Sequence, residues 1–107
     1  MDMRTVDSTI GGRPTLSVEG IIDLASLGDL HDALTRTIRE HSGAVVIVDL
    51  DAVVGIDDCA LGALLGAAAT ARENAGDLEL VCNNEAVRNR LERTRLDRAI
   101  TIRSTIS

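Results

Sequence analysis

One apolar run near the middle of the chain limits the folds that are open to this sequence. Residues 44–50, AVVIVDL, are apolar at six of seven positions, and four of these residues are β-branched. A short continuous run of this kind is typical of a strand that is buried on both faces. The chain therefore has to supply other strands beside this run and helices to cover it.

The segments around the run alternate between strand and helix periodicity. GGRP at residues 11–14 supplies a turn between the first two strands, which predicts an antiparallel hairpin. The order β-β-α-β-α-β-α-β then predicts an α/β protein with a mixed β-sheet, in which helices pack against the sheet. The expected strands are residues 3–10, 15–22, 44–50, 77–82 and 99–103, and the expected helices are residues 23–43, 58–75 and 83–94.

The composition restricts both the core and the function. We expect one domain over residues 1–107, whose core is aliphatic because the chain has no Phe, Tyr or Trp. All 11 basic residues are Arg, which excludes a P-loop lysine and a Schiff base. The net charge of −6 disfavours the phosphate backbone of nucleic acids as a direct partner. No stretch is long enough to span a membrane, so we expect a cytoplasmic protein without membrane insertion.

Two adjacent carboxylates and a thiol, those of Asp57, Asp58 and Cys59, stand at the expected start of the helix 58–75. One aspartate at such a place is explained by capping, because its side chain accepts hydrogen bonds from free backbone N–H groups of the first turn. Capping explains the second aspartate less well, because adjacent like charges repel. The sequence thus leaves a helix cap and a functional site as alternatives.

Catalytic and metal-binding interpretations find little support around these aspartates. The only histidines, His31 and His41, fall inside the expected first helix. Asp49 at the end of a strand resembles a phospho-acceptor of response regulators, but the lysine and the acidic pair of that family are missing. We therefore expect no enzyme activity, no metal and no cofactor.

Two further groups of residues have an ordinary and a functional interpretation. Cys59 and Cys82 are expected to be small buried residues rather than a redox pair, and we predict no disulfide between them. A cluster of five arginines is either a solvated helix face balanced by Glu85 and Glu92 or an anchor for an acidic partner. The cluster consists of Arg88, Arg90, Arg93, Arg95 and Arg98.

Three segments together resemble the STAS domain of anti-sigma factor antagonists, over about residues 15–102. VEGIIDLASLGDL is similar to a strand, a glycine and an aspartate before the first helix of that family. AVVIVDLDAVVGIDDCALGALLGAAATAR is similar to its central signature, in which Asp-Ser-[Ser/Thr]-Gly-Leu-Gly opens a helix. TRLDRAITI resembles its closing segment and final strand. The resemblance implies the STAS fold.

The resemblance also assigns a role to the aspartates. In that family a partner anti-sigma kinase phosphorylates a serine of the signature, which stops the antagonist from binding the kinase. By this match Asp57 takes the place of the signature aspartate, and Asp58 takes the place of the phosphorylated serine. Cys59 and Ala60 stand at the next two positions, Leu61 and Gly62 are retained, and Asp23 matches the acidic residue after the second strand.

The acceptor hydroxyl is therefore missing at the switch position. Either Asp58 mimics the phosphorylated state, or it caps the helix and the protein binds its partner without a phosphate switch. A phosphoserine carries a charge of about −1.5 to −2 and three acceptor oxygens, which one carboxylate imitates incompletely, and this favours the second alternative.

The resemblance implies a non-enzymatic regulator of transcription that binds an anti-sigma factor of the serine kinase type, or a related regulatory protein. The expected contact surface is the loop and helix start at residues 56–62, with Ile56 as its first residue and Asp23 beside it. The small residues Gly62, Ala63, Gly66 and Ala67 either admit a partner closely or pack tightly on the sheet. We expect a monomer or weak dimer. Alternative functions are an accessory subunit of a lipid-transport ABC system and a small-ligand sensor.

Overall fold

The computed structural model describes residues 2–104, so Met1 and residues 105–107 of the expected domain lie outside the description. The elements follow the expected order, with two additions, a 3₁₀ helix η1 and a short helix α4. Along the chain they are β1 (Arg4–Ile10), β2 (Arg13–Ile22), η1 (Leu24–Ser26), α1 (Leu27–Glu40), β3 (Val45–Ile56), α2 (Asp58–Glu73), β4 (Asp77–Val81), α3 (Glu85–Arg93), α4 (Leu96–Ala99) and β5 (Thr101–Arg103).

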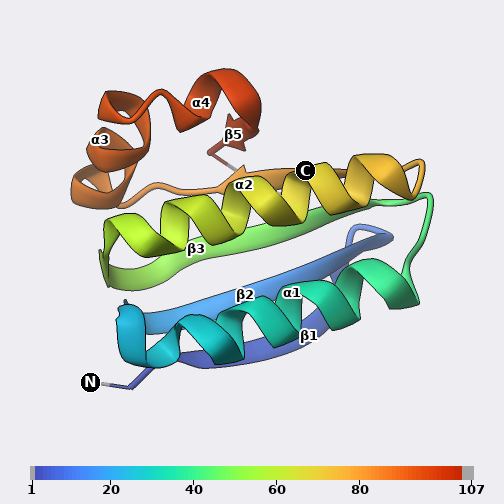
Figure 1. Ribbon diagram of the computed structural model, residues 1–107, viewed down its shortest axis with the longest axis horizontal. Helices are drawn as coiled ribbons and strands as arrows, with labels where there is room; N and C mark the ends of the chain where they lie inside the picture. Colours follow the sequence, from blue (N-terminus) through green and yellow to red (C-terminus); the bar gives the residue numbers. More distant parts are fainter. Residues whose placement is uncertain (1, 105–107) are drawn as a thin grey trace.

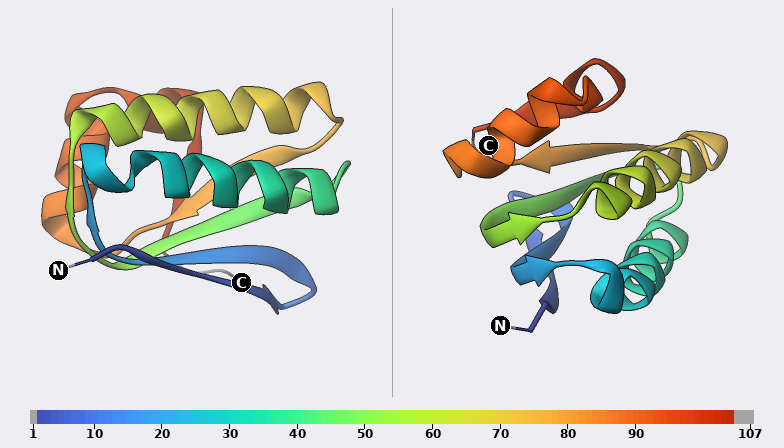
Figure 2. Two further views of the ribbon diagram at one scale, coloured as in Figure 1. Left: turned by 60° about the horizontal axis from the view of Figure 1, so that its bottom comes forward. Right: turned by 60° about the vertical axis from the view of Figure 1, so that its left-hand side comes forward.

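The strands form one mixed sheet in the order β1-β2-β3-β4-β5. β1 and β2 are the expected antiparallel hairpin, and β2, β3, β4 and β5 run parallel to one another. Figure 1 shows α1 and α2 side by side along the sheet, with α3 and α4 beyond them, and Figure 2 shows α1 and α2 together over one face of the strands. The α/β class and the mixed sheet are thus confirmed.

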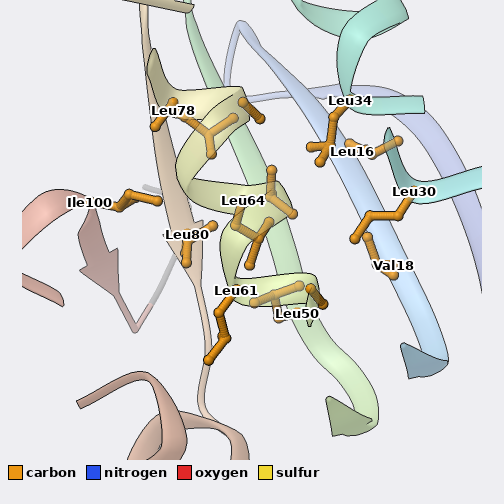
Figure 3. Close-up of a cluster of buried hydrophobic side chains, with 14 of the residues drawn as sticks. Leu16, Val18, Leu30, Leu34, Leu50, Leu61, Leu64, Leu78, Leu80 and Ile100 are labelled. Atoms are coloured by element: carbon orange, nitrogen blue, oxygen red, sulfur yellow. The ribbon is translucent and has the colours of Figure 1, made fainter. Parts of the chain in front are cut away.

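The core is aliphatic, as the composition predicts. Leu61 and Leu64 of α2 lie above β3 and β4, where they meet Leu50, Leu78 and Leu80 (Figure 3). α1 contributes Leu30 and Leu34 above Leu16 and Val18 of β2. Within the central run, Val46, Ile47 and Val48 are all fully buried. Because successive residues of a strand face opposite sides, both faces of β3 are covered at this point.

Several element boundaries differ from the expectation. β3 continues to Ile56, six residues beyond the apolar run, because it keeps pairing with β2 through two register shifts. The first helix is divided into η1 and α1 and ends at Glu40. The last strand begins only at Thr101, because α4 occupies the residues before it.

The end of α2 also differs in detail from the expected end at residue 75, just before Gly76. The helix stops at Glu73, and Ala75 adopts the left-handed conformation with φ 64°. Gly76 is required for a different reason, because a Cβ there would collide with the backbone carbonyl of Ala44. This close passage lets the turn after α2 reach the start of β4.

Within residues 2–104, none of the helices combines the length and the apolar character that a membrane crossing needs.

Candidate partner-binding site

The starts of η1, α2 and α3 lie at one end of the molecule (Figure 1). They follow the carboxyl ends of the parallel strands β2, β3 and β4, where binding sites of α/β sheets usually form. The backbone N–H of Asp57 donates a hydrogen bond of 2.8 Å to the carbonyl of Ile22. This bond brings the segment of Asp23 against the start of α2, so the two parts of the expected site are adjacent.

Asp23 forms a complete capping box with Ser26. Its carboxylate accepts from the Ser26 backbone N–H at 3.1 Å, and the Ser26 hydroxyl accepts from the Asp23 backbone N–H at 3.0 Å. The Ser26 hydroxyl in turn donates to the Asp23 carbonyl at 3.2 Å. This side chain therefore has a structural task at the start of η1, and it is partly exposed.

The start of α2 is built differently. Asp57 occupies the N-cap position in an extended conformation, yet its side chain makes no capping hydrogen bond. Asp58 is the first residue of the helix, so the interpretation of Asp58 as the cap is wrong. The backbone still closes the first turn, because Ala60 N–H donates to the Asp57 carbonyl at 3.0 Å. Both carboxylates stay exposed at the positive end of the helix dipole.

The Asp58 carboxylate is instead paired with Arg90 of α3. Arg90 donates from Nε at 3.0 Å and from Nη2 at 2.8 Å, both to Oδ1 of Asp58. The Asp58 side chain is 75 % exposed, and the Arg90 side chain is 42 % exposed. Sequence reasoning placed Arg90 in the arginine cluster but did not join it to Asp58, because 32 residues separate the two and only the sheet brings them together.

The arginine cluster is therefore divided in its contacts. Arg88 lies 3.5 Å from Glu92 one turn later, as the balanced-face interpretation expects, and it also donates to the Cys82 carbonyl at 3.0 Å. Arg90 and Arg93, with Thr94 and Asp58, line a surface hollow of about 320 Å³. One part of the cluster thus stabilises its own helix, and another part faces the start of α2.

The other expected contact residues fall into two groups. Ile56, Ala60 and Leu61 are buried in the core and hold α2 to the sheet. Cys59 is half-buried, and Gly62 is exposed. The accessible part of the expected surface therefore consists of Asp23, Asp57, Asp58, Cys59 and Gly62.

The small residues of α2 border a groove between α1 and α2. Gly62 and Gly66 are exposed, whereas Ala67 is buried. The groove has a volume of about 260 Å³ and is also lined by His31, Thr35 and Thr70. The small side chains thus leave space between the two helices, and Ala67 packs inward.

An exposed leucine is the feature of this end that the sequence analysis missed. Leu24 of η1 is 74 % exposed, the largest exposed fraction among the described large hydrophobic residues that stand out of the core. A hollow of about 310 Å³ at η1 is lined in part by Asp2, Asp23 and Asp29. Leu24 falls within the expected helix 23–43, in which no local pattern indicated a separate 3₁₀ turn.

The two cysteines are free thiols. Cys82 is buried, and burial raises the pKa of its thiol above the usual value of 9.0. Among residues 2–104, no group of three or more His, Cys, Asp or Glu side chains could hold a metal ion.

Comparison with known proteins gives a consistent result. The family model of the STAS domain matches residues 2–107. An anti-sigma factor antagonist from Mycobacterium paratuberculosis has a similar structure, with a TM-score of 0.88 at 23% sequence identity over 98% of this chain and 88% of that chain. A putative anti-sigma factor antagonist from Thermotoga maritima gives 0.83 at 20% identity over 95% and 87% of the two chains.

A third similar structure is that of the anti-sigma factor antagonist SpoIIAA in its unphosphorylated form. Its TM-score is 0.74 at 14% identity, over 94% of this chain and 89% of that chain. No curated protein sequence matches the chain. Identities this low show a common fold, and the family model covers nearly the whole sequence. The chain therefore belongs to the STAS domain family and has the fold of these anti-sigma factor antagonists.

Proposed function

We propose that this protein is a non-enzymatic regulator of transcription that binds an anti-sigma factor of the serine kinase type. Its contact surface is the end of the molecule formed by η1, the start of α2 and the neighbouring part of α3. The observation that carries the proposal is the start of α2, which holds the family signature in the expected place but has Asp58 where the signature has a serine.

The chemistry of this end suits a protein partner. Leu24 offers an exposed apolar side chain, and Asp23 and Asp57 lie around it on adjoining segments. An apolar contact with a charged rim is the usual composition of a protein interface. The matching surface of the partner is an apolar pocket with arginine or lysine residues at its edge, because opposite charges steer association.

The absence of a hydroxyl at position 58 makes the binding independent of ATP. A serine kinase has no acceptor at this position, so its activity does not release the protein. The test uses the purified ATP-binding anti-sigma factors of the source organism and measures binding by calorimetry, with and without ATP. We expect at least one of them to bind equally well in both conditions.

Two variants locate the surface. Leu24→Ala is expected to weaken binding about tenfold, which corresponds to the loss of one contact near the centre of an interface. Val6→Ala is the matched control, because Val6 is also an exposed apolar residue but lies on the edge strand β1. Equal loss of binding in both variants, or no binding by the wild-type protein, would contradict the proposal.

A third variant tests the missing hydroxyl. Incubation with the bound kinase and ATP should leave the wild-type chain unmodified, whereas Asp58→Ser should accept phosphate. Stoichiometric phosphate on residues 56–62 of the wild-type chain would show that the switch does not depend on position 58.

A further inference from the structure

The carboxylate at the switch position has its own cation within the chain. Arg90 directs two N–H groups at one oxygen of Asp58, at 3.0 and 2.8 Å. Nε and Nη2 of a guanidinium lie side by side on one edge, so both donate to Oδ1 while the second carboxylate oxygen stays open. The contact joins α2 to α3, which lie at the same end of the molecule (Figure 1).

The position of Arg90 is determined by hydrogen bonds of the two residues before α3. The exposed side chain of Arg90 does not determine it. Asn84 caps α3 by accepting from the backbone N–H of Ala86 and Val87. Its Nδ2 also donates to the carbonyl of Val53 at 2.9 Å, which fixes α3 to the end of β3. The preceding residue repeats this connection, because the Asn83 backbone N–H donates to Oδ1 of Asp51 at 2.7 Å.

The packing of α3 supports the same placement. Val87 and Leu91, on either side of Arg90, are buried in the core. β3 leads directly into α2, and α3 is bonded to β3, so the two helix starts keep a fixed separation. Because α3 is held in this position, the Arg90 side chain lies within reach of the Asp58 carboxylate.

Because Asp58 is paired with Arg90, the charge at the switch position differs from that of a phosphoserine. A phosphoserine without a counterion carries a charge of about −1.5 to −2, whereas the pair of Asp58 and Arg90 carries no net charge. The electric fields of two opposite charges 2.8 Å apart largely cancel far from the pair. An approaching partner therefore meets no net charge from this pair.

We propose that Arg90 is the built-in counterion of the switch position and keeps this chain in the charge state of an unphosphorylated antagonist. This inference rests on the proposed function. It adds the residue that determines whether the chain behaves as the unphosphorylated or the phosphorylated form of an antagonist. Asp58 then does not act as a phosphate mimic, and removal of Arg90 converts it into one.

The first experiment measures the charge at the switch position without any partner. Cys59, half-buried beside Asp58, reacts with a doubly anionic disulfide reagent (dithionitrobenzoate) and with a neutral one (dithiodipyridine). The ratio of the two rates reports the local potential, because the fraction of thiolate cancels in the ratio. Cys82 is fully buried, and a Cys59→Ser variant measures its contribution.

Arg90→Gln is expected to lower this ratio on the order of 2–5-fold at low ionic strength, since a single uncompensated charge repels the anionic reagent. Arg93→Gln is the matched control, with an arginine from the same helix and the same surface hollow that is not bonded to Asp58. Its effect should be smaller. The double variant Asp58→Asn, Arg90→Gln should return to the wild-type ratio. An equal effect of both single variants would overturn the proposal.

The second experiment measures binding to the anti-sigma kinase found as described above. Arg90→Gln should weaken binding about fivefold or more, and the added Asp58→Asn should restore it, because a neutral position is regained. If Asp58→Asn does not restore binding, Arg90 contacts the partner directly and the proposal is overturned. If no kinase binds the wild-type chain while the rate ratios behave as expected, the neutral pair stands and the proposed function is wrong.

Discussion

The starts of η1 and α2 lie next to each other and both begin with an aspartate, yet their aspartates are used in opposite ways. Asp23 returns its carboxylate to its own segment, where it forms a capping box with Ser26. Asp57 stands at the N-cap of α2 and makes no side-chain cap, and Asp58 reaches away to Arg90 on another helix. The first start is closed by local hydrogen bonds, whereas the second leaves polar groups available.

The difference shows that an aspartate at a helix start does not by itself have a structural role. A cap side chain contributes stability when it accepts a backbone N–H. Where it does not, the stability of the helix comes from its packing, and the carboxylate of the first turn is not used as a cap. Four tests follow, in order of decreasing expected effect.

The largest change in the free energy of unfolding is expected from a substitution on the buried face of α2 rather than at its first turn. Leu64 is fully buried against the sheet, so Leu64→Ala should lower the free energy of unfolding by about 2–5 kcal/mol. Urea denaturation followed by circular dichroism gives this value. A loss below that of the cap variants described next would show that α2 is not held mainly by its packing.

The next effect separates the two helix starts directly. Asp23→Ala removes a capping box and should cost about 0.5–2 kcal/mol, whereas Asp57→Ala removes no hydrogen bond and should cost only a few tenths of a kcal/mol. Both variants lose one negative charge, so each is a control for the other. Equal costs in urea denaturation would remove the distinction between the two starts.

A smaller effect is expected at Asp58. Its pair with Arg90 is exposed, so Asp58→Asn should cost about 0.2–1 kcal/mol at low salt, and the cost should shrink in molar salt. Denaturation curves of the wild-type chain and the variant at two salt concentrations measure the change. A cost that does not depend on salt would mean that Asp58 stabilises the helix by a hydrogen bond rather than by charge.

The smallest change in stability is expected from the buried thiol of Cys82, which directly follows β4. Burial raises the pKa of the Cys82 thiol above 9.0, so above about pH 9 the unfolded chain loses this proton more readily than the folded chain. The stability from this group is present below pH 9 and is lost as the pH rises through the raised pKa. Cys82→Ala should therefore lose less stability between pH 8 and 10 than the wild-type chain, as chemical denaturation at each pH would show.

The sequence predicted the architecture because its signals are local. The apolar run, the turn glycines and the helix spacings each lie within a few residues, and their order determines the sheet. The boundaries were harder to predict where distant pairing decides them. β3 reaches Ile56 because β2 continues beside it, which no local pattern of DAVVGI indicates.

The helix start that carries the candidate site was predicted, but the side-chain contacts there were not. The resemblance located Asp57 and Asp58 at a helix start, and the structure confirms this placement. The partner of Asp58 could not be predicted, because Arg90 is one of five arginines in a short segment and its selection depends on the position of α3. Leu24 was assigned to a continuous helix, and its exposure follows from the separate 3₁₀ turn.

The exposed glycines of α2 have a consequence for the motion of the helix start. Gly62 and Gly66 have no atom within 4 Å of where a Cβ would stand, so no close approach requires them. Each glycine in a helix interior costs about 0.5–1 kcal/mol relative to alanine. We therefore expect the first turns of α2 to open locally more often than the alanine-rich second half, so that their backbone amides exchange with solvent sooner. In the proposed complex, a partner bound at this end would also order these turns, so part of its binding energy would be used to fold them.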